Sequence, residues 1–458
     1  MAGVISYGAY VPRMRLGPET KNWPHPTERA ATNFDEDAVT MGVAAARECL
    51  NGFDRGEVDA LYFASTSGPY AEKQSAAIVA TAADLRRDVF TVDIAHSLRS
   101  GTQALRMALD GVKAGSFGKA LVVVSDNRQA PPGSDLEGAG GDAAVALLIG
   151  DEDPLLEPEA WRSRPKDILD VWRADGDNLL SAEQDLHFRF NDGYFDSVTD
   201  AAGGMLDGVD LVAMYSPDAR RRREMSGRLG LAGGQVVVLP ADVGSSGAAF
   251  VFLQLAHALE TATKGQRILL AGYGDGADCS VFRVTKDPAA APTGRRSLSE
   301  QLARATPVED YLDFLAWRGL GPFPDTGARI APATHALYRE QDEIIRFHGM
   351  KCGGCGMVQY PAQRVCVRCQ VKDNAEPVAM SEGGATLFSY SLDHVAGTPD
   401  SPLLHGVVDF EVGGRAMMQV TERDISAVQI GMKLDLTFRK FSQVDGISNY
   451  LWKAVLAP

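Results

Sequence analysis

The sequence predicts a layered α/β domain followed by a cysteine module and a small all-β barrel. Apolar, β-rich runs alternate with helical stretches through residues 1–285. Four cysteines follow with the spacing C-x2-C-x10-C-x2-C, from Cys352 to Cys369. Short apolar runs separated by glycines fill residues 376–458, a pattern typical of a small barrel. The 458 residues are enough for about three domains of ordinary size.

Residues 1–285 are expected to contain two similar sets of strands and helices. Continuous apolar runs such as KALVVVS and QRILLAG are typical of strands in a sheet that is covered on both faces. The first set has strands at 60–66, 89–94, 119–125 and 143–150, and helices at 76–85 and 102–114. The second has strands at 209–215, 235–239 and 266–273, and helices at 220–231 and 247–261. The repetition predicts an internally duplicated, layered fold.

Residues 286–337 are expected to form a linker that contains a helix. Its two ends, KDPAAAPTGRR and GLGPFPDTGARIAP, are rich in turn-forming residues. Residues 338–375 should then form a short helix and the cysteine module, and residues 376–458 the β barrel. The predicted domain boundary therefore lies within 286–337.

Composition narrows the classes of function. The net charge of -15 argues against a generic nucleic-acid binder, which needs a surplus of Lys and Arg to neutralise phosphates. No stretch approaches the roughly 18 consecutive apolar residues of a membrane span. The opening MAGVISYGAYVPR does not have the pattern of a signal peptide. We therefore expect a cytoplasmic protein with neither a nucleic acid nor a membrane as partner.

The cysteine module is the strongest local signal. Two CxxC knuckles match the tetrahedral spacing of a structural Zn(II) site, although four unligated thiols remain an alternative. Four protein ligands leave no open position for water, so the zinc should be structural. The ligands would be Cys352, Cys355, Cys366 and Cys369. Cys49 and Cys279 lie elsewhere and are best interpreted as small buried side chains.

Several motifs resemble the thiolase superfamily, in its 3-ketoacyl synthase III and 3-hydroxy-3-methylglutaryl-CoA synthase branch. They are GVISYGAYVPRMRL, SGPYAEKQSAAIVATAADL, SLRSGTQALRMAL, MYSPDAR and AGYGDGADCSVFRV. Residues 338–458 resemble the zinc-ribbon and oligonucleotide-binding-fold (OB-fold) proteins of the DUF35 type, which accompany such enzymes as a subunit or fusion. The resemblance implies a five-layered αβαβα domain and a homodimer with strand 89–94 at the interface. It also implies an acyl-CoA or acyl-carrier thioester as substrate, with a second enzyme subunit as a further candidate partner.

The chemical positions of that branch are all changed in this sequence. By the resemblance, Leu98 takes the place of the nucleophilic cysteine, and Tyr215 that of the histidine before Ser-Pro. Ser245 takes the place of the asparagine that helps to hold the thioester oxygen, and Thr66 that of the acid. The family's acyl-cysteine mechanism is therefore excluded if the correspondence holds.

The remaining residues are compatible with aldol or retro-aldol chemistry on an acyl thioester, which needs no covalent enzyme intermediate. Some thiolase-like proteins without the cysteine act as aldol lyases, and tyrosines are thought to carry their protons. The candidate catalytic residues are Tyr215, Tyr194, His96 and Ser245, and Arg99 is a further candidate to activate Tyr215. Ordinary packing remains an alternative for each tyrosine and for His96. Two other functions stay open: an acyltransferase or condensing enzyme, and a catalytically silent acyl-CoA-binding scaffold.

A run of four arginines, 220–223, follows the Tyr215 motif. Arginine pairs well with phosphate oxygens, so Arg220 is a candidate for contact with coenzyme A, supported more weakly by Lys73. A solvated helix face is the alternative.

Overall fold

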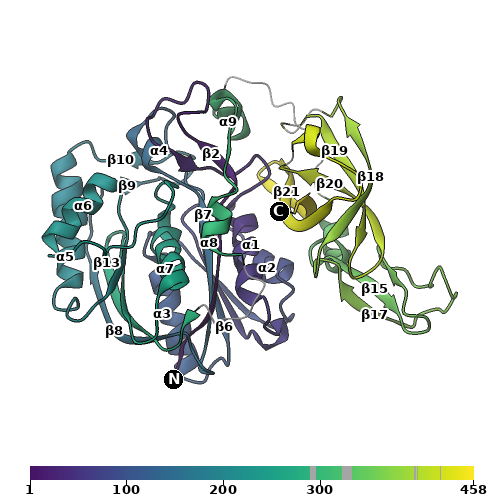
Figure 1. Ribbon diagram of the computed structural model, residues 1–458, viewed down its shortest axis with the longest axis horizontal. Coiled ribbons are helices and arrows are strands. Elements are labelled where there is room, and N and C mark those ends of the chain that lie inside the picture. Colours follow the sequence, from purple (N-terminus) through teal and green to yellow (C-terminus); the bar gives the residue numbers. More distant parts are fainter. Residues whose placement is uncertain (289–295, 322–332, 397–398, 400, 423, 458) are drawn as a thin grey trace. The chain divides into compact units, whose positions relative to one another are not determined.

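The computed structural model describes residues 1–288, 296–321, 333–396, 399, 401–422 and 424–457. The chain divides into two compact units, Met1–Gly321 and Pro322–Pro458 (Figure 1). In the described part of the chain, no helix is both long and apolar enough to cross a membrane. Each unit is described below by itself.

The first unit is organised around a nine-stranded sheet. In spatial order its strands are β11 (Leu211–Met214), β12 (Arg267–Tyr273), β13 (Gly276–Val284), β8 (Leu156–Pro165), β1 (Gly3–Tyr10), β7 (Ala143–Gly150), β6 (Ala120–Asp126), β4 (Ala60–Ala64) and β5 (Phe90–Ile94). Strands β6 and β7 are buried along their whole length, as predicted for a sheet covered on both faces.

The sheet consists of two halves with the same topology. In one half β4 pairs in parallel with β5 and β6, and the antiparallel strands β7 and β1 follow. In the other half β11 pairs in parallel with β12, and the antiparallel strands β13 and β8 follow. The halves meet where β1 pairs with β8, through Val4 and Leu156. This repeated order is the internal duplication that the sequence predicts.

One predicted strand is reduced to a single bridge. Within 235–239, only Val236 pairs, in parallel with Val212 of β11. This is the place that β5 occupies in the other half. Pro240 follows directly and has no N–H to donate, so the ladder cannot extend beyond Leu239.

Helices cover and separate the two halves of the sheet. Helix α1 contacts β1, β6 and β7, whereas α5 contacts β8, β12 and β13. Helix α7 contacts strands of both halves, β11 and β12 on one side and β1 and β7 on the other, and therefore belongs to the central layer. The helices are α1 (Ala38–Leu50), α2 (Ser75–Ala82), α3 (Ser100–Lys113), α4 (Asp135–Ala139), α5 (Asp196–Ala202), α6 (Ala219–Arg228) and α7 (Phe250–Thr261). The layered α/β fold class is confirmed.

Shorter elements complete this part of the chain. They are β2 (Met14–Leu16), β3 (Arg29–Ala30), β9 (Val171–Trp172), β10 (Ser181–Ala182), a π-helix (Phe188–Phe195) and 3-10 helices at Arg55–Glu57 and Gly247–Ala249.

The first unit extends further than the predicted end at residue 285. Helix α8 (Leu298–Leu302) adds Leu298 and Leu302 to the main core, and β14 (Thr306–Pro307) pairs with β2. Helix α9 (Tyr311–Trp317) forms a second small core with Leu16, Ala31 and Val308. Much of the predicted linker is thus part of the domain, because its apolar side chains have a surface to cover. Residues 289–295 and 322–332, which hold most of its turn-rich ends, lie outside the described residues.

The second unit contains a cysteine module and a closed barrel. The module consists of α10 (Thr334–Arg339), α11 (Gln341–Ile344) and a sheet of β16 (Val358–Gln359), β15 (His348–Cys352) and β17 (Ala375–Ala379). The barrel order is β18 (Ala385–Asp393), β19 (Leu403–Phe410), β20 (Arg415–Thr421), β22 (Ile447–Leu456) and β21 (Lys433–Val444), with a 3-10 helix at Ile425–Ala427. Stacked aromatic rings such as Phe438 on Tyr450 lie among its buried side chains.

Candidate functional site

Three tyrosines gather where β11 and β12 end. Tyr215 directly follows β11, and Tyr273 is the last residue of the parallel neighbour β12, so both lie at the same edge of the sheet. Tyr194 comes from the π-helix. The ring centroids are 5.9 Å apart for Tyr215 and Tyr273, 6.2 Å for Tyr194 and Tyr215, and 5.3 Å for Tyr194 and Tyr273. The packing brings together the two predicted tyrosines and one that the prediction did not include.

Tyr215 is a buried phenol whose charge state is set by opposing effects. Burial raises its pKa, while Arg128, Ser245 and Arg189 act in the other direction. Because the net pKa is raised above 10, the side chain is neutral at neutral pH. In that state it donates a hydrogen bond or a proton more readily than it acts as a base. The buried Oγ of Ser245 makes no hydrogen bond of normal geometry, but it lies close enough to the Tyr215 hydroxyl to lower its pKa.

Tyr194 holds the backbone of this site. Its hydroxyl donates a 2.6 Å hydrogen bond to the backbone carbonyl of Tyr215. The side chain is 1% exposed, and burial raises its pKa well above the usual value. This hydroxyl is therefore already engaged, and its geometry supports a role in positioning Tyr215.

Tyr273 pairs with a carboxylate that sequence reasoning missed. Its hydroxyl lies 2.6 Å from Oδ2 of Asp170, and Asp170 is the residue that directly precedes β9. Burial raises the pKa of Asp170 and, more strongly, that of Tyr273. A carboxylate with a raised pKa is a better proton acceptor near neutral pH than an exposed one. The signal available in the sequence was that Tyr273 precedes the glycine turn GDG, but nothing there indicates Asp170 as its partner.

The buried carboxylate of Asp126 joins two neighbouring segments of the first unit. It ends β6 and accepts hydrogen bonds from Ser65, Ser67, both the backbone and the hydroxyl of Thr66, and the backbone N–H of Ala248. The donors come from the loop after β4 and from the 3-10 helix before α7. Asp126 is therefore saturated and fixes Thr66 in place.

The turn that carries Leu98 lies against the Tyr273 turn. Ser97 Oγ donates to the carbonyl of Gly274 at 3.0 Å, and a side chain on Gly274 would come within 3.0 Å of Leu98 Cβ. Arg99 is occupied elsewhere, with 2.6 Å to the Gly274 carbonyl and 3.0 Å to Asp278. The prediction that Arg99 activates Tyr215 therefore has no support in these contacts.

His96 is placed differently from the other candidates. It adopts a left-handed conformation with φ 73° and is exposed. Within the described residues no hydrogen bond, ion pair or ring contact joins its side chain to Tyr215 or Tyr194. Strand β5, which leads into this turn, is an edge strand with exposed and half-exposed residues.

Neither predicted phosphate contact is part of the tyrosine cluster. Arg220 is exposed near the start of α6, while its neighbour Arg221 pairs with Asp218 at 3.0 Å. Lys73 lies 5.2 Å from the centroid of the Tyr70 ring, and burial lowers its pKa although Asp93 opposes this. Both cations lie on the surface, where they can reach a phosphate.

The four cysteines of the module form one compact cluster. Their sulfur atoms all lie within 4.8 Å of one another, with 3.5 Å between Cys352 and Cys369 and 3.6 Å between Cys355 and Cys366. Backbone N–H groups of Cys369 and Arg368 favour the thiolate of Cys366 and lower its pKa to about 6. Four sulfurs at this spacing fit a tetrahedral zinc ion.

The two units of the chain are similar to different known proteins. The hydroxymethylglutaryl-CoA synthase of Archaeoglobus fulgidus is 32% identical over 310 residues, 62% of this chain and 89% of that protein. The chain belongs to the hydroxymethylglutaryl-CoA synthase family. The corresponding enzyme of Methanocaldococcus jannaschii is 29% identical over 308 residues, again 62% of this chain and 89% of the relative.

Solved structures show the same fold in that family and its neighbours. MvaS in complex with 3-hydroxy-3-methylglutaryl coenzyme A superimposes with a TM-score of 0.60 at 21% identity, covering 72% of this chain and 94% of that one. The 3-oxoacyl-[acyl-carrier-protein] synthase III of Aquifex aeolicus gives 0.54 at 18% identity, covering 62% and 100%. The family model of the ChsH2 C-terminal OB-fold domain matches residues 378–439. A thiolase-superfamily domain fused to an OB-fold domain is therefore confirmed.

The first unit offers no reactive cysteine near the predicted chemical positions. Leu98 has no nucleophilic atom, and the two cysteines outside the module are both fully buried. Cys49 lies in α1 and Cys279 in β13, and burial raises the pKa of Cys279 to about 12. Neither side chain is accessible from solvent, and the thiol of Cys279 is not ionised at neutral pH. The polar groups that the fold assembles are phenols, a carboxylate and a serine hydroxyl.

Proposed function

We propose that this protein makes or breaks a carbon–carbon bond on an acyl-CoA-type thioester without an acyl-cysteine, by an aldol or retro-aldol step. Membership of a family of acyl-CoA condensing enzymes supports the substrate class, and relatives of the same fold have been solved with 3-hydroxy-3-methylglutaryl-CoA and with CoA. The observation that carries the reaction type is the Tyr215, Tyr273 and Asp170 cluster beside Leu98.

In the retro-aldol direction, the 3-hydroxyl of the substrate loses its proton and the C2–C3 bond breaks. The electron pair moves onto the thioester, which becomes an enolate, and a proton then returns to C2. The Tyr273–Asp170 pair is the proton acceptor in this proposal, because burial makes Asp170 more basic. Tyr215 and Ser245 donate hydrogen bonds to the thioester oxygen as its charge develops. The products are an aldehyde or ketone and a shorter acyl-CoA.

In this proposal Tyr215 is a hydrogen-bond donor and not the general base. A general base must give up its proton near neutral pH, and burial of Tyr215 opposes this. A neutral phenol is suited instead to hydrogen-bond donation in the transition state. Tyr194 positions Tyr215 through its backbone, and His96 has no assigned step.

The test is incubation of the full chain with a panel of 3-hydroxyacyl-CoAs, followed by mass spectrometry of the CoA esters. We expect a shortened acyl-CoA and an equimolar carbonyl product from at least one ester. Formation of an acyl adduct on any cysteine would contradict the proposal. Since the curated relatives are synthases, a condensing reaction that starts from a ready-made thioester is the second candidate, and it would appear as a longer acyl-CoA.

Three further features belong to this proposal. Arg220 and Lys73 would contact the phosphates of coenzyme A. Zn(II) on the four cysteines would stabilise the module that precedes the barrel. A homodimer would form through β5, which pairs on one edge only, with β4, and exposes 49% of Phe90. Sedimentation as a 49.0 kDa particle at micromolar concentration would exclude the dimer.

A further inference from the structure

Arg128 is a half-buried arginine with an unused hydrogen-bond donor. It follows β6 by two residues, and its stem packs against Gly247, where an added Cβ would come within 2.9 Å of Arg128 Cδ. Its Nε is buried and has no hydrogen-bond partner. Within the described residues the guanidinium makes no ion pair. A buried donor with no acceptor is costly, so the group is suited to a ligand.

The acidic groups around Arg128 are already satisfied by other donors. A small polar cavity is lined by Arg128 together with Arg29, Arg318, Glu137 and Asp142, among others. Asp142 accepts from Arg29 at 3.2 Å and from the backbone and hydroxyl of Thr32 at 2.7 and 3.0 Å. Glu137 accepts from Tyr311 at 2.8 Å and from the Gly133 N–H at 2.7 Å.

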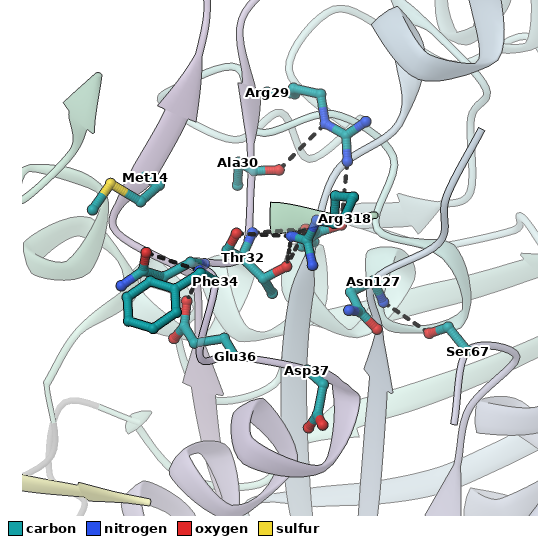
Figure 2. A network of polar contacts seen from close by, with 12 residues as sticks. Met14, Arg29, Ala30, Thr32, Phe34, Glu36, Asp37, Ser67, Asn127 and Arg318 are labelled. Carbon is teal, nitrogen blue, oxygen red and sulfur yellow. Dashed lines mark hydrogen bonds and ion pairs between the residues drawn. The ribbon is translucent and has the colours of Figure 1, made fainter. Parts of the chain in front are cut away.

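The other two guanidiniums of the cavity are also occupied. Figure 2 shows Arg29 and Arg318 with their partners: Arg318 donates to the carbonyl of Thr32 at 2.7 Å and also to its hydroxyl. Arg29 donates to the carbonyl of Glu137 at 2.9 Å. Two carboxylates therefore balance two arginines, and Arg128 is left as the uncompensated cation of this cavity.

The backbone on both sides of Arg128 is held in place. The N–H of Asn127 donates to Ser67 Oγ at 2.8 Å, a contact visible in Figure 2. The carbonyl of Gln129 accepts from Leu180 at 2.9 Å. The arginine is thus presented from a fixed segment, as expected for a binding group.

The positive charge of Arg128 also acts on Tyr215. Its effect is the largest of those that oppose burial in setting the pKa of Tyr215, although no hydrogen bond joins the two side chains. Gly247, which packs against its stem, lies two residues after Ser245, whose hydroxyl also lowers the pKa of Tyr215. The charge of Arg128 and the hydroxyl of Ser245 therefore both act on Tyr215.

We propose that Arg128 is the recognition site for a carboxylate carried by the acyl group of the substrate. The inference rests on the proposed function and narrows its substrate class to acyl-CoAs with a free acid on the acyl chain. A guanidinium presents parallel N–H donors that match a carboxylate, and a charged hydrogen bond in a buried site discriminates strongly against a neutral group of the same size.

The test measures equilibrium binding by calorimetry to the full chain, with pairs that differ only in carboxylate against methyl. Succinyl-CoA is compared with butyryl-CoA, and methylmalonyl-CoA with isobutyryl-CoA. We expect the acid of at least one pair to bind about tenfold more tightly, which is about 1.4 kcal/mol. Arg128→Gln should abolish this preference, and Arg128→Lys should retain part of it because the charge remains. Arg189→Gln is the matched control: Arg189 also acts on Tyr215, but its guanidinium lies over the Phe190 ring at 5.1 Å.

Each outcome decides the inference. Equal binding within both pairs, or an unchanged preference in Arg128→Gln, would overturn it while leaving the proposed function intact. Loss of the preference in Arg189→Gln as well would overturn the assignment to Arg128. Failure of every acyl-CoA to bind would overturn the proposed function and the inference together. If circular dichroism shows that Arg128→Gln is unfolded, Arg128→Lys decides instead. A preference for the acid as large as that of the wild type would overturn recognition by paired guanidinium donors, and a reduced preference would support it.

Discussion

The cysteine cluster and the tyrosine cluster of this protein are assembled in opposite ways. All four sulfurs come from one short stretch, Cys352 to Cys369, and each knuckle is local. Tyr215, Tyr273 and Asp170 come from three distant segments, and the Tyr273–Asp170 hydrogen bond spans 103 positions in the chain. A local site is visible in sequence spacing, whereas a site made by strand ends becomes visible only once the sheet is formed. Removal of a single atom should therefore have different effects at the two clusters, on folding at the cysteines and on catalysis at the tyrosines.

The largest effect is expected at the cysteine cluster. Cys366→Ser should abolish zinc binding and unfold the module, because binding free energies of structural zinc sites are about 10–16 kcal/mol. Elemental analysis and hydrogen exchange across β15 and β17 would measure this. The first unit should keep its fold, because both of its cores consist of residues before position 322. Val367→Ala is the control, since this neighbouring side chain is 62% exposed. Stoichiometric zinc in Cys366→Ser would contradict the four-thiolate site.

In the tyrosine cluster a single atom should affect chemistry and leave the fold intact. Tyr215→Phe removes one hydroxyl and should lower kcat by about 10²–10³-fold, the range for loss of one hydrogen-bond donor to a developing oxyanion. Tyr194→Phe is the matched variant: its lost hydrogen bond to the Tyr215 carbonyl should cost about 0.5–1.5 kcal/mol of stability. Steady-state kinetics and thermal unfolding of both variants separate the two roles. Equal kcat in wild type and Tyr215→Phe would refute the tyrosine mechanism.

The Tyr273–Asp170 pair predicts a pH dependence of the reaction. Asp170 must be ionised to accept a proton, so kcat should rise as pH increases through its pKa. Burial raises that pKa, opposed by Tyr273, the Val171 N–H and Arg189, while Asp275 adds to the rise. The acid limb should therefore lie above the ordinary aspartate range. Asp170→Asn should lower kcat by about 10²-fold and remove this limb. A pH–rate profile that keeps the same acid limb in Asp170→Asn would assign the base elsewhere.

The contrast between the clusters also explains what the sequence could predict. Strands such as β6 and β7 and the zinc-type spacing depend on neighbouring residues, and they match the structure. The chain after residue 285 was assigned to a linker because turn formers surround it, yet α9 folds against Leu16, nearly three hundred positions earlier. Asp170 and Arg128 were missed for the same reason. Asp170 is an ordinary loop residue until β12 brings Tyr273 to it, and Arg128 is one until the turn at Gly247 packs against its stem.

The smallest effect on turnover is expected from alkylation of cysteines, a treatment that compares the two clusters directly. Treatment with iodoacetamide should leave turnover unchanged, because no thiol belongs to the tyrosine cluster in this proposal. Cys49 and Cys279 are fully buried and therefore inaccessible to the reagent, and burial also raises the pKa of Cys279 to about 12. The four remaining sulfurs would be protected by zinc. Chelation before alkylation should therefore expose four sites of modification per chain, counted by mass spectrometry, and should unfold the module. A cysteine-dependent synthase would lose activity without any chelator, and the same loss here would place a thiol in the reaction.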